Sequence, residues 1–588
     1  MSKLRLIFPI RILITLMLLT LAGSSVCGAG NESGYPLKSY EVKVSVECDS
    51  PAAAAQADLR FLPLPPGKKV AFSCRWDDNN VANLRMKKLM QQYGYKGTFY
   101  LLQPSEKFKQ TVLGELCKDG FTIGNHTLHH YNLSSLTPNG IFYEMMANRI
   151  LLERLSHQTV TAFIFPGGSF ATTFYPETAH DFSTCMRRTG ILGGPGKSTP
   201  RLNKIPGNDF FTTEGRIITP GDRNTSTKKF DFYVKKFMPA PGKTAHMNLG
   251  IHVWHSDKDF AELEKSMKKY AHRPDWWYCN ENEFLAYAYM HKYAKVIDKK
   301  VNANQVEFTV QLPMPEYLGS DTPLWAECSG KSVAIAHTRK LPAKIAVANP
   351  NGSNEIFPEI KAKLSFPEPD RVRLEVVNTA APLENVRFIL HLPPDFAEET
   401  IFTEVGTIHN QYSREWKLTP HPAGKSTGIQ LTALQMDFLR NQENARLWVQ
   451  HTLQTPPQPS DSLKVFCAQQ KFTTQDLEKL SLPDTALDPA VFAPASTQLN
   501  YRETVFKVSG KVVNKESLTV VAEFTGGQAI TLQGTLPDTI YCNGQKLHPR
   551  QREISFTAPA GKCRIVFQHL NSRRPVRFVQ LIIKKQTD

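Results

Sequence analysis

The sequence predicts an α/β domain of the parallel barrel type, followed by two all-β, sandwich-like domains. From residue 68 to residue 298, short apolar runs of strand length alternate with longer segments of helical length, which is the order found in parallel α/β barrels. After Ala294 this alternation stops, and short strands separated by turns follow to the end of the chain. Repeated short strands without intervening helices are typical of β-sandwiches.

The chain divides into six segments. A length of 588 residues fits several domains, at roughly 100–200 residues for each domain. We expect a signal peptide at 1–28, an N-terminal strand and connector at 29–67, the α/β domain at 68–298, a β-sandwich at 299–454, a proline-rich linker and loop region at 455–497, and a C-terminal β domain at 498–588.

The first strand of the α/β domain is the run Val70–Cys74, whose largely apolar composition indicates a strand buried on both faces. The same patterns predict further strands at 97–102, 121–123 and 160–165, and helices at 81–93, 109–118 and 137–156. In the β regions the expected strands are Val306–Leu312, Val333–Ala336, Ala343–Ala348, Val372–Val377, Val386–Leu392, Val505–Val513, Leu518–Phe524, Ala529–Leu532, Arg552–Phe556 and Cys563–Phe567.

The first 28 residues have the pattern of a secretory signal. Basic residues precede the apolar run Ile12–Leu21, and small residues follow it. The run is too short for a membrane span, so we expect a secreted or periplasmic protein with no transmembrane anchor in the mature chain. A lipid anchor on Cys27 is less favoured, because Val26 is bulky where lipoprotein signals normally have Gly or Ala.

The net charge of +16 constrains the partners. The basic residues are scattered along the chain and do not form runs, so nucleic acid is not an expected partner. Association with a negatively charged cell surface is left open. The ten cysteines include no C-x-x-C pair, so a structural zinc ribbon is not expected.

Two adjacent carboxylates, Asp77 and Asp78, follow the first strand. Strand C-termini are where the active sites of α/β barrels lie. Neighbouring acids repel each other, and this repulsion is relieved if one binds a metal and the other acts as a base. An Asp-Asp pair would equally be expected in a loop that caps the next helix.

Two histidines, His126 and His130, follow the strand at 121–123 with a spacing of four residues. On a helical turn this spacing places both imidazoles on one face, where they can bind one cation. His129 points elsewhere on that geometry, and we interpret it as a bystander. One Asp with two His makes a three-ligand metal site with open positions for water and substrate.

These motifs resemble those of the NodB-homology polysaccharide deacetylases, the family-four carbohydrate esterases. W-D-D-N and H-T-L-H-H are similar to the family's first two motifs, and the resemblance extends over roughly residues 68–294. It implies an irregular seven-stranded (β/α)7 barrel. It also implies that Asp77 is the general base and that Asp78, His126 and His130 bind one divalent metal ion, usually zinc. Asn79 replaces the usual Gly of the first motif.

The third motif departs from the family pattern. A-F-I-F-P-G-G-S-F, at 162–170, is similar to the family's F-R-x-P-x-G, but Ile164 stands where the family has the Arg that orients the base. Arg75 lies two residues before Asp77 and is a candidate replacement, provided that no bulge interrupts the strand. By resemblance, Pro166 and Gly167 line the oxyanion and substrate position, with the Gly167 N–H as a donor.

The general acid has two candidates in M-N-L-G-I-H-V-W-H-S-D, at 247–257. An apolar strand that ends in His resembles the family's fifth motif. The W-H-S letters favour His255 as the acid that protonates the leaving group, and His252 is the alternative. The two are three residues apart, so on a strand they point to opposite faces. The family's acidic fourth motif has two candidates, Asp209 and Asp222.

The resemblance implies a secreted, metal-dependent deacetylase that removes N- or O-acetyl groups from an acetylated polysaccharide or oligosaccharide. The alternative is a non-catalytic glycan-binding or cell-surface protein on a degenerate deacetylase barrel. The missing third-motif Arg supports the alternative, whereas the presence of both acids and both metal-binding histidines argues against it.

Overall fold

The computed structural model describes most of the chain between Lys38 and Lys585. The described residues are 38–130, 133, 138–166, 176–194, 216–218, 226–250, 252–253, 255–421, 428–455, 464–468, 496–500, 505–510, 518–526, 529–533, 539–547, 553–557, 561–569 and 579–585. Within these ranges, no helix is both long and apolar enough to cross a bilayer.

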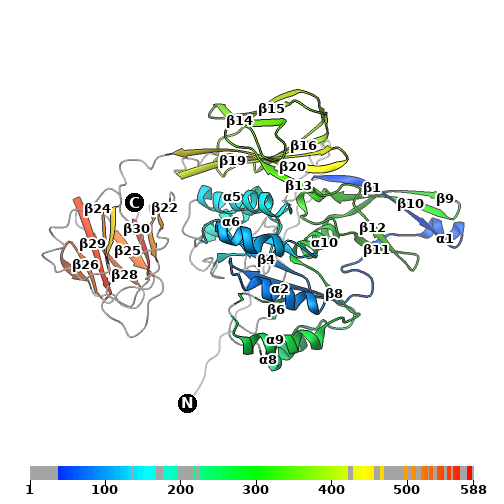
Figure 1. Cartoon of the computed structure of the whole chain (residues 1–588), viewed down its shortest axis with the longest axis horizontal. Helices are drawn as coiled ribbons and strands as arrows, with labels where there is room; N and C mark the ends of the chain where they lie inside the picture. Colours follow the sequence, from blue (N-terminus) through cyan, green and yellow to red (C-terminus); the bar gives the residue numbers. More distant parts are fainter. Residues whose placement is uncertain are drawn as a thin grey trace, which may run out of the picture.

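A six-stranded parallel sheet forms the core of the α/β domain (Figure 1). Its order is β5-β4-β3-β7-β6, and β8 pairs with the beginning of β3. Isolated bridges from Asn125 to Phe163 and from Ala162 to Gly193 extend the sheet beyond β5. The strands are β3 (Val70–Asp77), β4 (Gly97–Leu101), β5 (Thr122–Asn125), β6 (Arg216–Ile218), β7 (Ala245–Leu249) and β8 (Trp276–Tyr278). The expected parallel core is confirmed, and closure into a seven-stranded barrel stays a prediction.

Helices connect these strands. The expected helices at 81–93 and 137–156 correspond to α2 and α5, whereas the one at 109–118 is a π-helical turn followed by one short α-helical turn. The helices are α2 (Asn83–Gln92), α3 (Glu106–Phe108), η1 (Lys109–Leu113), α4 (Gly114–Leu116), α5 (Pro138–Ser156), α6 (Pro176–Arg188), α8 (Thr227–Phe237), α9 (Asp257–Tyr270) and α10 (Glu281–Tyr293).

The two faces of β3 have different surroundings. Phe72, Cys74 and Trp76 belong to an apolar cluster that also includes residues of the covering helices, such as Met86 and Met90 of α2. Because side chains alternate along a strand, Ser73, Arg75 and Asp77 point to the other, inner face, where all three are buried. The interior of this domain therefore contains polar and charged side chains.

The N-terminal segment pairs with strands that follow the α/β domain. The expected strands at 306–312 and 333–336 do not enter the sandwich, because they lie in small sheets of order β1-β10-β9 and β12-β11-β2. Residues 298 and 299, the expected boundary, both lie inside β9. The elements are β1 (Ser39–Glu47), α1 (Pro51–Gln56), β2 (Arg60–Phe61), β9 (Lys295–Asn302), β10 (Gln305–Pro313), η5 (Pro315–Tyr317), β11 (Leu324–Cys328) and β12 (Lys331–Ile335).

Two further sheets enclose a shared apolar core between residues 344 and 455. One has the order β13-β20-β19-β16-β17 and the other β14-β15-β18. Helix α5 lies against the first of these sheets (Figure 1), where its apolar residues share a cluster with Ile345, Leu431 and Trp448. The strands are β13 (Lys344–Val347), β14 (Ile360–Glu368), β15 (Arg371–Asn378), β16 (Leu383–His391), β17 (Thr400–Ile408), β18 (Gln411–Lys417), β19 (Gly428–Arg440) and β20 (Glu443–Thr455).

The C-terminal part also consists of two sheets, of order β21-β24-β29-β26-β27 and β22-β23-β30-β25-β28. Strand β21 comes from the segment expected to be a linker. The strands are β21 (Lys464–Ala468), β22 (Ser496–Asn500), β23 (Val505–Gly510), β24 (Leu518–Gly526), β25 (Ala529–Gln533), β26 (Thr539–Cys542), β27 (Gln545–Leu547), β28 (Glu553–Thr557), β29 (Gly561–His569) and β30 (Val579–Lys585). The expectation of all-β sheets after the α/β domain is confirmed.

Candidate metal centre and active site

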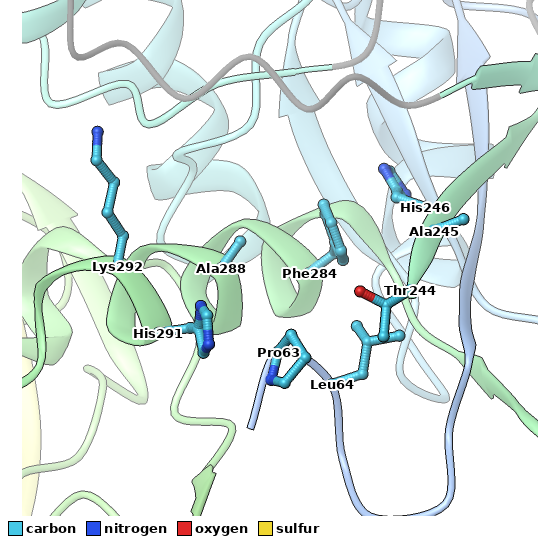
Figure 2. A pocket seen from close by; sticks show the side chains of 9 residues that line it. All are labelled: Pro63, Leu64, Thr244, Ala245, His246, Phe284, Ala288, His291 and Lys292. Atoms are coloured by element: carbon cyan, nitrogen blue, oxygen red, sulfur yellow. The ribbon is translucent and has the colours of Figure 1, made fainter. Parts of the chain in front are cut away.

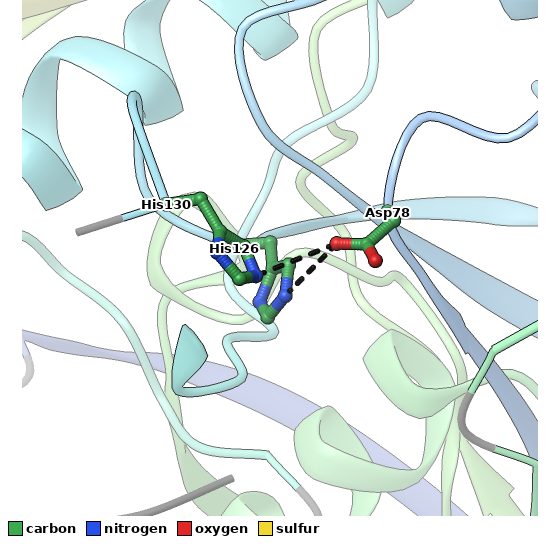
Figure 3. Close-up of side chains that lie close together, drawn as sticks. All are labelled: Asp78, His126 and His130. Atoms are coloured by element: carbon green, nitrogen blue, oxygen red, sulfur yellow. Dashed lines mark ion pairs between the residues drawn. The ribbon is translucent and has the colours of Figure 1, made fainter. Parts of the chain in front are cut away.

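Asp78, His126 and His130 come together at the carboxyl ends of β3 and β5 (Figure 3). The Asp78 Oδ1 atom lies 3.6 Å from His126 Nε2 and 3.5 Å from His130 Nε2. Asp78 has a φ of 75°, a left-handed conformation that Asp tolerates better than most residues. This conformation occurs where the chain leaves β3, beside the two imidazoles.

The three ligand atoms fit one small divalent cation. They all lie within 4.8 Å of one another. Zinc ligands at about 2.0–2.1 Å from the ion in tetrahedral geometry lie roughly 3.3 Å apart, close to the two separations from Asp78 Oδ1. Two imidazoles with one carboxylate also form a donor set that zinc and other first-row metals accept. A divalent-metal site is therefore supported, and zinc as the ion stays a prediction.

His126 is held in a tautomer suited to metal binding. Its Nδ1 lies 3.0 Å from the carbonyl oxygen of Ile164, so Nδ1 carries the proton and Nε2 presents its lone pair toward Asp78. Burial first, and then the charge of His130, lower the pKa of His126 to about 3. A neutral imidazole is the form that binds a metal. Ile164 thus contributes its backbone to the site, although its side chain cannot replace an Arg.

His129 holds the loop of residues 126–130, which carries His126, His129 and His130, in place. Its Nδ1 lies 2.6 Å from Oε1 of Glu144, and its backbone N–H donates to the other carboxylate oxygen at 2.8 Å. Glu144 is buried on α5, and its backbone carbonyl also accepts from the Leu128 N–H at 3.0 Å. His129 contacts Glu144 and does not belong to the group of three candidate ligands, although residues 126–130 form a loop and not the expected helical turn. Its contacts fix the loop that carries His126 and His130.

Asp77 ends β3 beside the metal cluster and is bound by Arg75. The Arg75 Nη2 atom donates to Asp77 Oδ2 at 2.8 Å, and both side chains are buried. The backbone runs without a bulge from Arg75 to Asp77, because both pair in regular register with β4. Arg75 thus contacts Asp77 as expected for a candidate replacement of the Arg that is absent at Ile164, and its role there stays a prediction.

The structure brings His252, and not His255, to the cluster. Asp77 and His252 form a parallel β-bridge, and His252 Nε2 lies 3.7 Å from Asp78 Oδ2. The ring of His255 instead makes T-shaped contacts with the rings of Trp76 and Phe260, whose centroids are 6.0 and 5.6 Å away. Trp76 belongs to the helix-covered face of β3. This geometry favours the alternative acid, His252, over His255.

The comparisons with known proteins agree with these motifs. The family model described as polysaccharide deacetylase matches residues 66–181. This part of the chain carries the polysaccharide deacetylase signature. The Bacillus subtilis strain 168 protein YxkH, named as a candidate polysaccharide deacetylase, is 25% identical over 150 residues, which are 24% of this chain and 54% of that protein. The chain thus covers about half the length of this curated relative.

Solved deacetylase structures are similar at low identity. The Bacillus subtilis peptidoglycan deacetylase PdaC is 16% identical over 38% of this chain and 92% of its own, with a TM-score of 0.25. A family 4 acetyl xylan esterase from Clostridium thermocellum, in complex with a cobalt ion, is 14% identical over 37% and 90%, also with a TM-score of 0.25.

The remaining predicted site residues differ in whether the structure describes them. Asn79, which stands in place of a Gly, donates from its side-chain amide to the carbonyl oxygens of Leu102 and Gln103 at 3.2 and 3.0 Å. Pro166 is buried at the end of the third motif. Gly167, the expected oxyanion donor, and both fourth-motif candidates, Asp209 and Asp222, lie outside the described residues.

A group of buried polar side chains below Asp77 was not expected from the sequence. It consists of Ser73, His246, Asn248 and Glu281, each of which is buried or nearly so. Alternation along β3 gives one signal, since Ser73, Arg75 and Asp77 share a face of the strand. The sequence gives no comparable signal for Glu281, because only the packing of α10 brings it to that face.

A pocket of about 530 Å³ lies near the amino end of β7, and Figure 2 shows the side chains that line it. Its lining includes His246, Phe284 and Lys292. His246 is near the beginning of β7, whereas His252 follows the end of that strand. Because active sites of parallel α/β folds lie at the carboxyl ends of the strands, we assign the chemistry to the metal cluster and not to this pocket.

Proposed function

We propose that the α/β domain is a metal-dependent deacetylase that hydrolyses acetyl groups on a polysaccharide or oligosaccharide. The observation that carries the proposal is the placement of Asp78, His126 and His130 around one point, with the Arg75-bound Asp77 next to them. The family match over residues 66–181 supports the reaction class. The geometry is what an acyl-transfer site requires: a metal site, a base and an acid at the ends of neighbouring strands.

Asp78, His126 and His130 would hold the divalent cation. When bound, the cation polarises the acetyl carbonyl and lowers the pKa of a coordinated water. Ile164 and Glu144 keep the two imidazoles in position, through His126 Nδ1 and through the His129 loop. Such outer partners fix ring orientation and commonly affect metal affinity.

Asp77 acts as the general base. It accepts a proton from the water that attacks the acetyl carbonyl, and the Arg75 guanidinium fixes the orientation of its carboxylate. In this way Arg75 compensates for the absence of the third-motif Arg. The missing third-motif Arg was the main reason to consider a degenerate, non-catalytic barrel. That reason no longer holds if Arg75 binds Asp77 in its place.

His252 acts as the general acid. Its Nε2 faces the same Asp78 carboxylate as the metal-binding imidazoles, and Asn80 donates to the neighbouring carbonyl of Val253 at 3.1 Å. We infer that His252 gives a proton to the leaving amine or alcohol when the bond to the acetyl carbon breaks. His255, the expected acid, then serves in aromatic packing.

The substrate and the location follow from the same proposal. Acetate is released and the sugar keeps a free amine or hydroxyl, depending on whether an N- or an O-acetyl group is cleaved. An exported protein, secreted or periplasmic, would meet such glycans outside the cytoplasm. We assign the N-terminal 28 residues the role of the export signal.

The test is acetate release from a panel of acetylated glycans: chitin oligosaccharides, acetylated xylan and peptidoglycan fragments. The full chain is freed of metal by a chelator and reloaded with Zn²⁺ or Co²⁺. We expect acetate from at least one glycan class, loss of release with the chelator, and recovery on reloading. A protein that holds one metal ion and binds glycan, yet releases no acetate from any member, is the non-catalytic binding protein instead.

A further inference from the structure

The loop of residues 126–130 has a strained backbone. Thr127 has a φ of 68° and His130 a φ of 61°. This left-handed region is uncommon for any residue with a side chain and an outlier for a β-branched one such as Thr. Thr127 directly follows the candidate ligand His126, and its Oγ1 accepts from the N–H of His130 at 3.1 Å. Strained conformations persist only where the surroundings hold them, so the contacts of this loop decide where both imidazoles lie.

Two oxygen atoms hold the beginning of the loop. The N–H of His126 donates to the backbone carbonyl of Leu101, at the end of β4, at 3.1 Å. The N–H of Thr127 donates to Oδ1 of the Asn125 side chain at 2.9 Å. The positions of these two oxygens therefore set the path of the backbone through the first ligand and the residue that follows it.

One side chain, Asn148 of α5, donates to both oxygens. Its Nδ2 atom lies 2.9 Å from the Leu101 carbonyl oxygen and 2.9 Å from Asn125 Oδ1, so the two N–H bonds of one amide serve two acceptors. Asn148 is fully buried. Helix α5 also holds Asn125 through a second contact, because Asn125 Nδ2 donates to the Met145 carbonyl oxygen at 2.7 Å.

The same face of α5 holds the other part of the loop. Glu144 accepts from the backbone N–H of His129 at 2.8 Å and contacts its ring at 2.6 Å. Glu144 and Asn148 are four residues apart, a spacing that places both side chains on one side of a helix. The loop is therefore fastened to one helix at two points, on either side of its strained residue Thr127.

We propose that Asn148 is a positioning residue that sets the metal affinity of the site by holding the start of the loop of residues 126–130. The claim rests on the proposed function, in which Asp78, His126 and His130 bind the cation. Asn148 acts through the Leu101 carbonyl and the Asn125 side chain, and its effect reaches His126 through the backbone. A ligand loop that is held in place before the metal arrives needs less ordering when the metal binds.

The test is the substitution Asn148→Leu in the full chain. Leu is branched at the same carbon as Asn but offers no donor, and both oxygens keep the loop N–H as a partner. We expect the dissociation constant for Zn²⁺, titrated into the metal-free chain, to rise by about 10- to 100-fold, as for other outer partners of metal ligands. Hydrogen exchange at the amides of His126 and Thr127 should become faster by at least about 10-fold.

The matched control is Asn354→Leu, in the part of the chain between β13 and β14. Asn354 is also a buried Asn that donates from Nδ2 to two backbone carbonyls, those of Phe357 and Ile360, both at 3.0 Å. We expect this control to lower the melting temperature and to leave the Zn²⁺ affinity and the two exchange rates at wild-type values.

Two results would overturn the proposal. One is wild-type Zn²⁺ affinity together with wild-type exchange at residues 126 and 127 in Asn148→Leu. The other is an equal loss of affinity in Asn354→Leu at an equal fall in melting temperature, because general destabilisation would then explain both. Should Asn148→Leu fail to fold, Asn148→Ala, which removes the same two donors without added bulk, is measured in the same way and is expected to show the same losses.

Metal affinity and acetate release separate this inference from the proposed function. If Asn148→Leu binds Zn²⁺ more weakly than the wild type, yet the wild type releases acetate from no glycan, the deacetylase assignment fails and the role of Asn148 stands. If the wild type releases acetate and Asn148→Leu binds Zn²⁺ as tightly as the wild type does, the role of Asn148 is wrong and the deacetylase assignment is unaffected.

Discussion

Substitution of Glu153 should lower the free energy of unfolding, because this side chain joins the α/β domain to the sheet that covers α5. Glu153 is fully buried on α5. Its Oε1 accepts from Arg149 and from the backbone N–H of Val160, both at 2.9 Å. Its Oε2 accepts from Arg446 Nη1 and Trp448 Nε1 of β20, both at 2.8 Å. One carboxylate therefore joins two parts of the chain that are almost 300 residues apart.

We expect Glu153→Gln to lower the free energy of unfolding strongly. Arg446 is fully buried and also binds Asp437 at 2.6 and 3.0 Å, so it cannot turn to solvent when Glu153 is neutralised. Gln offers one acceptor where Glu has two, and its amide N–H groups face other donors. Removal of one partner of a buried ion pair costs about 3–5 kcal/mol, a large share of a typical unfolding free energy of about 5–15 kcal/mol.

The assay is urea unfolding followed by tryptophan fluorescence, with Trp448 in the affected contact. The matched control is Glu115→Gln, because Glu115 pairs with Lys118 at an exposed position and its loss should leave the midpoint near that of the wild type. A variant Glu153→Gln as stable as the wild type would refute the reasoning that this contact holds the two parts together.

The difference in unfolding free energy between the wild type and Glu153→Gln should also depend on pH, and the direction follows from the pKa of Glu153. Burial acts to raise the pKa of Glu153, but Arg149 and Arg446 outweigh it, and the net pKa is lowered. A carboxyl whose folded-state pKa is depressed stabilises the fold above its unfolded pKa of about 4.3. That stability is lost as the pH falls through the folded pKa. The deficit of Glu153→Gln should therefore be full at pH 7 and shrink below about pH 4.

Three further predictions concern the site and the domain boundary. His252→Ala should lose most activity on substrates with poor leaving groups and much less on an activated aryl acetate, whereas His255→Ala should lower the melting temperature with little leaving-group dependence; the reverse pattern would make His255 the acid. Glu144→Ala should weaken metal binding by about 10- to 100-fold, because the His129 loop loses its anchor, and an unchanged titration with Zn²⁺ would contradict this. A chain truncated after Asp298 should be insoluble or metal-free, because it loses the paired strand β10 and the sheet that covers α5; a soluble, active product would show that the sheets are dispensable.

Local patterns predicted the residues of the candidate metal site because these residues follow strands directly. The carboxyl ends of parallel strands meet at one edge of a sheet, so Asp78 and His126 could be brought together without knowledge of the loops. Strand alternation likewise placed Arg75 on the side of Asp77. These inferences needed only the strand positions, which the apolar runs indicate.

Features that depend on strand pairing were beyond the sequence. Alternation showed that His252 and His255 face opposite sides, but only the bridge to Asp77 decides which side is the inside. The pattern also revealed β1 and β10 as strands without showing that they pair with each other across some 265 residues. For the same reason the boundary expected at 298 falls inside β9. Glu281 lies in the first turn of α10, and the sequence of that turn does not indicate which part of the protein it packs against.

The central claim is that Asp78 helps to hold one divalent cation while Asp77 acts as a base without being a main ligand. The most direct test measures bound metal and acetate release together in Asp77→Asn and Asp78→Asn. The account predicts that Asp77→Asn keeps one metal per chain and loses turnover by about 10²–10⁴, whereas Asp78→Asn loses the metal. An Asp77→Asn protein with an empty site, beside an Asp78→Asn protein that retains its metal, would contradict it.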